Sequence, residues 1–108
     1  MAWFRRRRGP RGPSIDHARY RDDLAHLEQF AHSRYGVEAY LEPRTTVTET
    51  TVMLIAHDGE WTRRRVVDPH AARQLANRLA IPLYDVRLVG YPQRMRDFNE
   101  RRKRSANS

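Results

Sequence analysis

The 108-residue chain has no cysteine, which excludes a disulfide scaffold, a thiolate metal site and thiol catalysis. It also has no apolar run near the roughly 18–20 residues that a membrane-spanning helix needs. Its first four residues lead into Arg5–Arg8 instead of the apolar segment that a secretory signal requires. We therefore expect a cytoplasmic protein.

Glycine and lysine are also scarce. The five glycines do not form the glycine-rich turn, between a strand and a helix, that holds the phosphates of a dinucleotide. The sequence therefore predicts no nicotinamide or flavin cofactor. One lysine stands against twenty arginines, a ratio that fits either phosphate ligation or the codon usage of a GC-rich genome.

The net charge of +8 is concentrated at the two ends of the chain. Residues 1–13 carry a net charge of +5 and residues 92–108 carry +4, whereas residues 14–91 carry −1. Blocks of like charge stay solvated and commonly act as interaction arms. The sequence predicts one near-neutral domain, residues 14–91, between two basic arms, the second of which begins as a short helix.

Two stretches have the pattern of helices. Apolar residues at helical spacing predict a helix over residues 15–35, with Ser14 as its N-cap and Gly36 at its end. The apolar stripe consists of Tyr20, Leu24, Leu27, Ala31 and Tyr35. A second amphipathic stretch, residues 69–79, follows an Asp-Pro pair that favours the start of a helix.

Four stretches have the pattern of strands. Residues 37–42 alternate apolar and polar residues and are expected to be half-buried. Residues 45–57 are rich in Thr, Val and Ile, and their apolar second half predicts a central strand. Asp58-Gly59 predicts a two-residue hairpin turn into a strand over residues 61–67, and a fourth strand is expected over residues 83–89.

This order of elements predicts an α+β fold with a single small domain. We expect a mainly antiparallel sheet with the helices on one face. Several runs of the sequence resemble a family of small uncharacterised actinobacterial proteins, some of which are labelled oxidoreductases. The runs are 37–40, 42–43, 47–52, 58–65, 81–86 and 90–97, together with the start 1–5. The missing phosphate cradle gives the oxidoreductase label no chemical support.

Two further resemblances concern the order of the elements. Restriction-endonuclease-like nucleases share it, but they need an acid two residues before a strand lysine, and here Thr62 follows Glu60. Double-stranded-RNA-binding domains share the first five elements, but the second helix here opens with Asp68 and one arginine, Arg73. The five histidines lack the spacing of a metal site and are expected on solvated surface. The sequence predicts neither catalysis nor a bound metal.

Trp61, Arg63 and Arg65 are expected on one face of a strand, because alternate residues share a face. If this row is exposed, it can stack a base and hold phosphate. If Trp61 is half-buried, the arginines are expected to pair with Glu49 or nearby acids. The sequence leaves both interpretations open.

The basic arms give the strongest indication of function. Each phosphate that an arginine neutralises releases counterions, and this term dominates non-specific nucleic-acid binding. We expect a non-catalytic nucleic-acid-binding protein, with RNA, and ribosomal RNA in particular, as the favoured partner. The alternatives are a membrane-surface protein anchored by Trp3 and Phe4, and a protein-interaction adaptor that uses the sheet edge. The candidate residues are Arg5, Arg6, Arg7, Arg8, Arg11, Trp61, Arg63, Arg65, Arg94, Arg96, Arg101, Arg102, Lys103 and Arg104.

Overall fold

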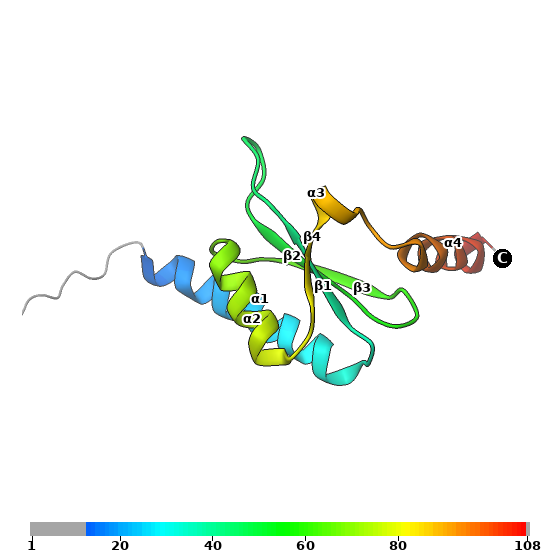
Figure 1. Ribbon diagram of the computed structural model, residues 1–108, viewed down its shortest axis with the longest axis horizontal. Coiled ribbons are helices and arrows are strands. Elements are labelled where there is room, and N and C mark those ends of the chain that lie inside the picture. The colour runs from blue at the N-terminus through cyan, green and yellow to red at the C-terminus, as the bar shows by residue number, and fades with distance from the viewer. Residues whose placement is uncertain (1–12, 108) are drawn as a thin grey trace, which may run out of the picture.

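The apolar run in the middle of the chain forms the central strand of a four-stranded sheet, in the order β3-β2-β1-β4 (Figure 1). The computed structural model describes residues 13–107. In chain order the elements are α1 (Pro13–Ser33), β1 (Glu38–Glu42), β2 (Thr51–Ile55), β3 (Trp61–Arg65), α2 (Pro69–Leu79), β4 (Leu83–Asp85), α3 (Val86–Val89) and α4 (Gln93–Asn107). β2 pairs antiparallel with both neighbours, and β4 pairs parallel with β1. The predicted α+β class and element order are confirmed.

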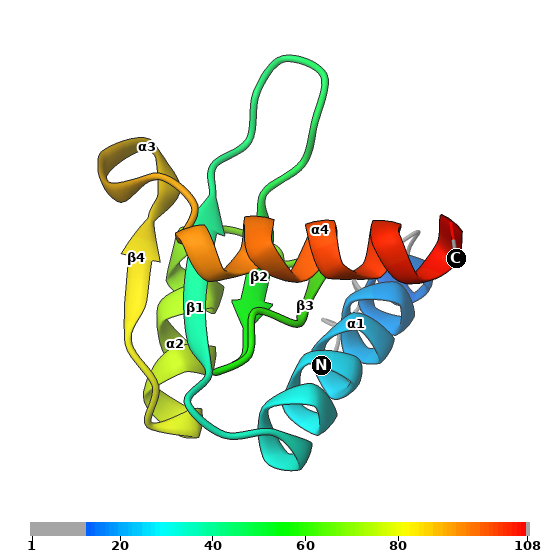
Figure 2. The ribbon, with the colours of Figure 1, turned by 90° about the vertical axis from the view of Figure 1, so that its right-hand side faces the viewer.

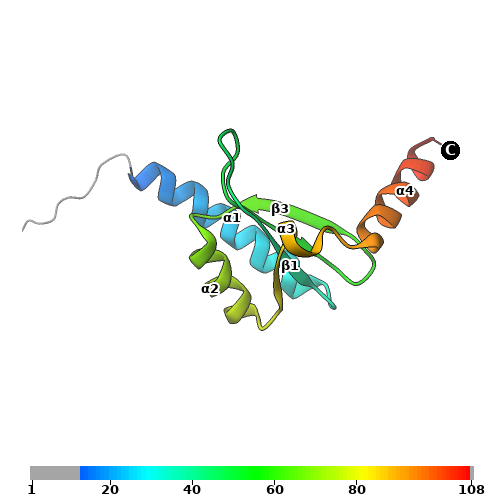
Figure 3. The ribbon, with the colours of Figure 1, turned by 45° about the horizontal axis from the view of Figure 1, so that its top comes forward.

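The main core lies between the sheet and the two helices α1 and α2, which cover the same face (Figures 1 and 3). Leu27 and Phe30 of α1 and Leu75 of α2 are buried against Val52 and Leu54 of β2. The predicted start of α2 is confirmed, because the Asp68 side chain accepts a hydrogen bond of 2.9 Å from the backbone N–H of Ala71.

The opposite face of the sheet carries a second, smaller cluster. Tyr40, Met53 and Ile55 are buried there under Tyr91 and Met95, and α4 passes over this side of the sheet (Figure 2). Tyr40 is only 5% exposed. The prediction of a half-buried β1 is therefore wrong, because the chain after α3 returns to cover the second face.

Four predicted elements have other bounds. The strand expected over residues 61–67 ends at Arg65. Of the strand expected over residues 45–57, only Thr51–Ile55 forms a strand, which is β2. The residues before it form a loop that extends beyond the sheet (Figure 2). The strand expected over residues 83–89 ends at Asp85, whose side chain accepts from the N–H of Arg87 at 2.9 Å and starts α3. The last helix is not short, because α4 continues to Asn107.

The first helix is also displaced. α1 begins at Pro13, so Ser14 lies inside the helix and the predicted N-cap is wrong. The helix ends at Ser33, and Tyr35, predicted to belong to the apolar stripe, lies beyond it with 79% of its surface exposed. Gly36 adopts a positive φ of 65°, as its predicted role at the helix end requires.

The turn between β2 and β3 has three residues, His57 to Gly59, and not the predicted two. The N–H of Gly59 donates to the carbonyl of Ala56 at 2.9 Å. The N–H of Ala56 in turn donates to the carbonyl of Glu60 at 2.8 Å, which closes the turn. The predicted positive φ of Gly59 is confirmed at 94°. A Cβ at Gly59 would lie 2.0 Å from the carbonyl oxygen of Arg94 in α4, so only glycine lets the two segments meet.

Replacing this glycine is expected to loosen α4. Gly59→Ala adds a steric clash to backbone strain, whereas Gly90→Ala adds strain alone, since a Cβ at Gly90 (φ 71°) meets nothing within 4 Å. We expect Gly59→Ala to lower the free energy of unfolding by more than the roughly 1–3 kcal/mol of strain alone. Urea unfolding of both variants measures this, and an equal loss in the two would contradict the close packing.

Candidate nucleic-acid interface

α4 presents most of the cations of the C-terminal arm to solvent. Its first half rests on the sheet and its second half extends past it (Figures 1 and 2). Within residues 13–107, Arg96, Arg101, Arg102 and Lys103 form no ion pair, and Arg104 approaches Glu100 only at 3.8 Å. The charges of Arg96, Arg101, Arg102 and Lys103 are therefore not neutralised by an acid of the described residues.

The four cations at positions 101–104 point in four different directions. Consecutive residues of an α-helix are rotated by about 100°, so a run of four surrounds the helix axis. All side chains from Asn99 to Asn107 are exposed. The end of α4 is thus charged all round and has no apolar face.

Arg94 differs from the other cations of α4. Its guanidinium donates to a carboxylate oxygen of Glu38 at 2.7 Å and to the carbonyl of Ala56 at 3.0 Å, and its side chain is 30% exposed. Burial by itself raises the pKa of Glu38, but hydrogen bonds from Arg94 and Tyr40 outweigh it and hold this pKa below its usual value. The sequence predicts that Arg94 binds phosphate, but in the structure it fastens α4 to the sheet.

Two more contacts hold α4 to the body. The indole N–H of Trp61 donates to the side-chain oxygen of Asn99 at 2.9 Å, and Arg101 donates to the carbonyl of Asp58 at 2.8 Å. Sequence reasoning missed the anchoring role of Arg94. Arg94 lies four residues before Phe98, and residues at this spacing share one side of a helix. Both face Gly59, so this spacing is the sequence signal that could have indicated an anchoring role.

The β3 arginines are bound to carboxylates. Arg63 donates to both oxygens of Glu42, at 2.7 and 2.9 Å. Arg65 lies 3.3 Å from Asp23 and 3.5 Å from Glu49. Trp61 is half-buried, so the arrangement is the one in which the arginines pair with nearby acids. Nucleic-acid binding by Trp61, Arg63 and Arg65 stays a prediction.

The carboxylate of Glu42 joins several elements. Besides Arg63, it accepts from the hydroxyl of Thr51 at 2.7 Å and from the hydroxyl of Tyr91. Burial raises the pKa of Glu42, but the bonds from Arg63, Tyr91 and Thr51 overcome this and lower it. Glu42 also lines a groove of about 800 Å³ between the loop before β2 and α3.

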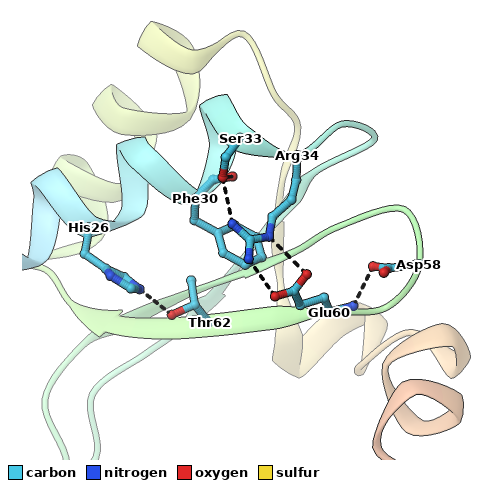
Figure 4. Close-up of polar contacts among 7 residues, drawn as sticks. All are labelled: His26, Phe30, Ser33, Arg34, Asp58, Glu60 and Thr62. Atoms are coloured by element: carbon cyan, nitrogen blue, oxygen red, sulfur yellow. Dashed lines mark hydrogen bonds and ion pairs between the residues drawn. The ribbon is translucent and has the colours of Figure 1, made fainter. Parts of the chain in front are cut away.

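Asp58, predicted in the hairpin turn, and Glu60, considered above for a nuclease site, both have structural contacts (Figure 4). Asp58 accepts from the backbone N–H of Glu60 at 3.0 Å, and Glu60 accepts from Arg34 at 2.6 and 3.1 Å. His26, expected on solvated surface, is half-buried and shares a hydrogen bond of 2.7 Å with Thr62. Burial first, and then Arg64, lowers its pKa.

Neither family models nor curated proteins nor solved structures give a match to the chain. The resemblance to the actinobacterial family therefore stays a prediction. Within residues 13–107, no helix is long and apolar enough to cross a membrane. The predicted residues Arg5, Arg6, Arg7, Arg8 and Arg11, and the proposed membrane anchors Trp3 and Phe4, lie outside the described residues.

The Glu42 contacts predict a pH-dependent loss of stability. Because the pKa of Glu42 is lowered in the folded state, its contribution is complete above its ordinary pKa near 4.5 and disappears as pH falls through the lower folded value. Glu42→Gln should cost about 1–3 kcal/mol at pH 7 and much less at pH 3.

Urea unfolding at both pH values measures this difference. Glu100→Gln is the control, because Glu100 is 60% exposed and its single ion pair is long, so little change is expected. A Glu42→Gln penalty of the same size at pH 3 would contradict the assignment.

Proposed function

We propose that the protein is a non-catalytic nucleic-acid-binding protein of the cytoplasm. RNA, and ribosomal RNA in particular, is the favoured partner, and the cations of α4 bind its phosphates together with the N-terminal arm. One observation carries the proposal: Arg96, Arg101, Arg102 and Lys103 form no ion pair within the described residues, while arginines of β3 are bound to carboxylates.

The direction of the charges supports a polyanion over a membrane surface. A helix that lies on a membrane needs an apolar face opposite its charged face. The end of α4 has cations all round instead, an arrangement suited to phosphates that approach from more than one side. Arginine adds to this, because its planar group donates two hydrogen bonds to one phosphate.

Removing charge from α4 should weaken RNA binding and its salt dependence. Each phosphate contact to a single strand contributes about −0.7 to the slope of log affinity against log salt. The triple variant Arg96→Gln, Arg102→Gln and Lys103→Gln leaves Arg101, which contacts the turn, in place and should therefore flatten the slope by about 2. Titration of single-stranded RNA at several salt concentrations measures it.

A matched control removes the same charge from the folded body. This control combines Arg73→Gln, Arg78→Gln and Arg87→Gln, which change residues of α2 and α3. Arg78 is already paired with Glu28, and Arg87 with Asp85. The slope should stay unchanged in this control. An equal effect of both triple variants, or undetectable RNA binding by the full chain, would overturn the proposal. Tighter binding to anionic vesicles than to RNA would favour the membrane alternative instead.

A further inference from the structure

Two aromatic rings stack on one another at the surface, just beyond the end of α1. The rings of Tyr35 and His57 have centroids 5.7 Å apart and an angle of 20° between their planes. Tyr35 is 79% exposed and His57 is also exposed. Tyr35 therefore adds little to the core, and the side of its ring away from His57 is open to solvent.

The backbone holds this pair in place. The N–H of His57 donates to the carbonyl of Tyr35 at 3.1 Å. Between them, Gly36 has a φ of 65°, and a Cβ there would lie 2.9 Å from the Cβ of His57. The two segments are thus in close contact, and the rings are positioned before any ligand binds.

The residue before Tyr35 adds a second anchor. Arg34 donates two hydrogen bonds to Glu60, and its guanidinium lies over the ring of Phe30 at 4.2 Å (Figure 4). The end of α1 is therefore tied to the start of β3. A preformed site loses less conformational freedom on binding.

The pair lies beside the basic helix. His57 and Asp58 are consecutive in the β2–β3 turn, and Arg101 of α4 donates to the carbonyl of Asp58 at 2.8 Å. Arg94 donates to Ala56, the residue before His57. The exposed aromatic pair and the first of the exposed cations at positions 101–104 of α4 therefore flank the same turn.

We propose that Tyr35, supported by His57, stacks with an unpaired base of a single-stranded nucleic acid whose phosphates are held by α4. This inference rests on the proposed function. Every base has a π-face, so stacking on an aromatic ring tolerates any sequence, and proteins reach RNA bases most readily where they are unpaired.

The test compares a polyanion with bases and one without. Full-length protein is titrated with single-stranded RNA and with inorganic polyphosphate. Tyr35→Ala should weaken RNA binding by about 5- to 150-fold, the range that one stacked base provides, and should leave polyphosphate binding unchanged. Tyr35→Phe, which keeps the ring, should bind both like the wild type.

Tyr84→Ala is the control, because Tyr84 is also exposed but lies on the edge strand β4, where its ring contacts Tyr40 at a tilted angle of 38°. It should change neither affinity. Equal effects of Tyr35→Ala on RNA and polyphosphate, or no effect on either, would overturn the stacking site and leave the proposed function standing. Failure of the wild type to bind any nucleic acid would instead overturn the proposed function.

Discussion

The contact between α4 and the β2–β3 turn fixes the position of the basic end of the chain. No residue of α4 is buried, and a single helix of about 15 residues is marginally stable in water. Its order therefore depends on the few places where it touches the body. Gly59 lets the α4 backbone approach, and Arg94 reaches across to Glu38 and the carbonyl of Ala56. A side chain at position 59 would remove the first of these contacts and misplace the second.

The acids around each arginine decide whether its charge is neutralised within the fold. Arg63 is bound by Glu42, Arg34 by Glu60 and Arg78 by Glu28, and in these pairs the charge is neutralised within the fold. Arg102 and Lys103 of α4 form no such pair within the described residues, and Arg104 approaches Glu100 at 3.8 Å. Of the net charge of +8, residues 14–91 carry −1, and the positive charge belongs to residues 1–13 and to the segment 92–108 that contains α4. Charge that is concentrated in this way gives an anionic partner preferred points of approach.

Local signals predicted the parts of the fold that local chemistry decides. Asp68 caps α2 and Gly59 takes a positive φ, because side-chain hydrogen bonding and missing Cβ atoms act within a few residues. The loop before β2 has strand-forming residues, but strand propensity counts only where a neighbouring strand supplies hydrogen bonds. Alternation favoured a strand through residues 86–89, and the cap at Asp85 started a helix instead.

The candidate site depended on contacts between segments distant in sequence, and it was predicted less well. Arg94 and Arg96 look alike in the sequence, yet Arg94 bonds to Glu38 and to the carbonyl of Ala56 on the sheet side, whereas Arg96 bonds only to Gln93 and Tyr91 of its own segment within the described residues. Trp61 and Arg63 allowed two interpretations, and the choice required knowing that Glu42 lies opposite, on β1. Tyr35 fits the helical spacing of the stripe, so periodicity could not show that the helix ends two residues earlier.

The three-residue turn links the two halves of the proposed binding surface. Gly59 and the carbonyl of Asp58 contact α4, while His57 carries the ring beneath Tyr35. The groups proposed to bind phosphate and to stack a base are thus set at a fixed separation by one short segment, although they come from α4 and from the end of α1. The charges of Arg102 and Lys103, which do not contact the turn, can be removed without moving the rings, whereas a change in the turn moves both the rings and α4. Binding to such a preformed surface depends on the geometry of the turn as well as on charge. Binding through a basic tail attached to a neutral domain would depend on charge alone.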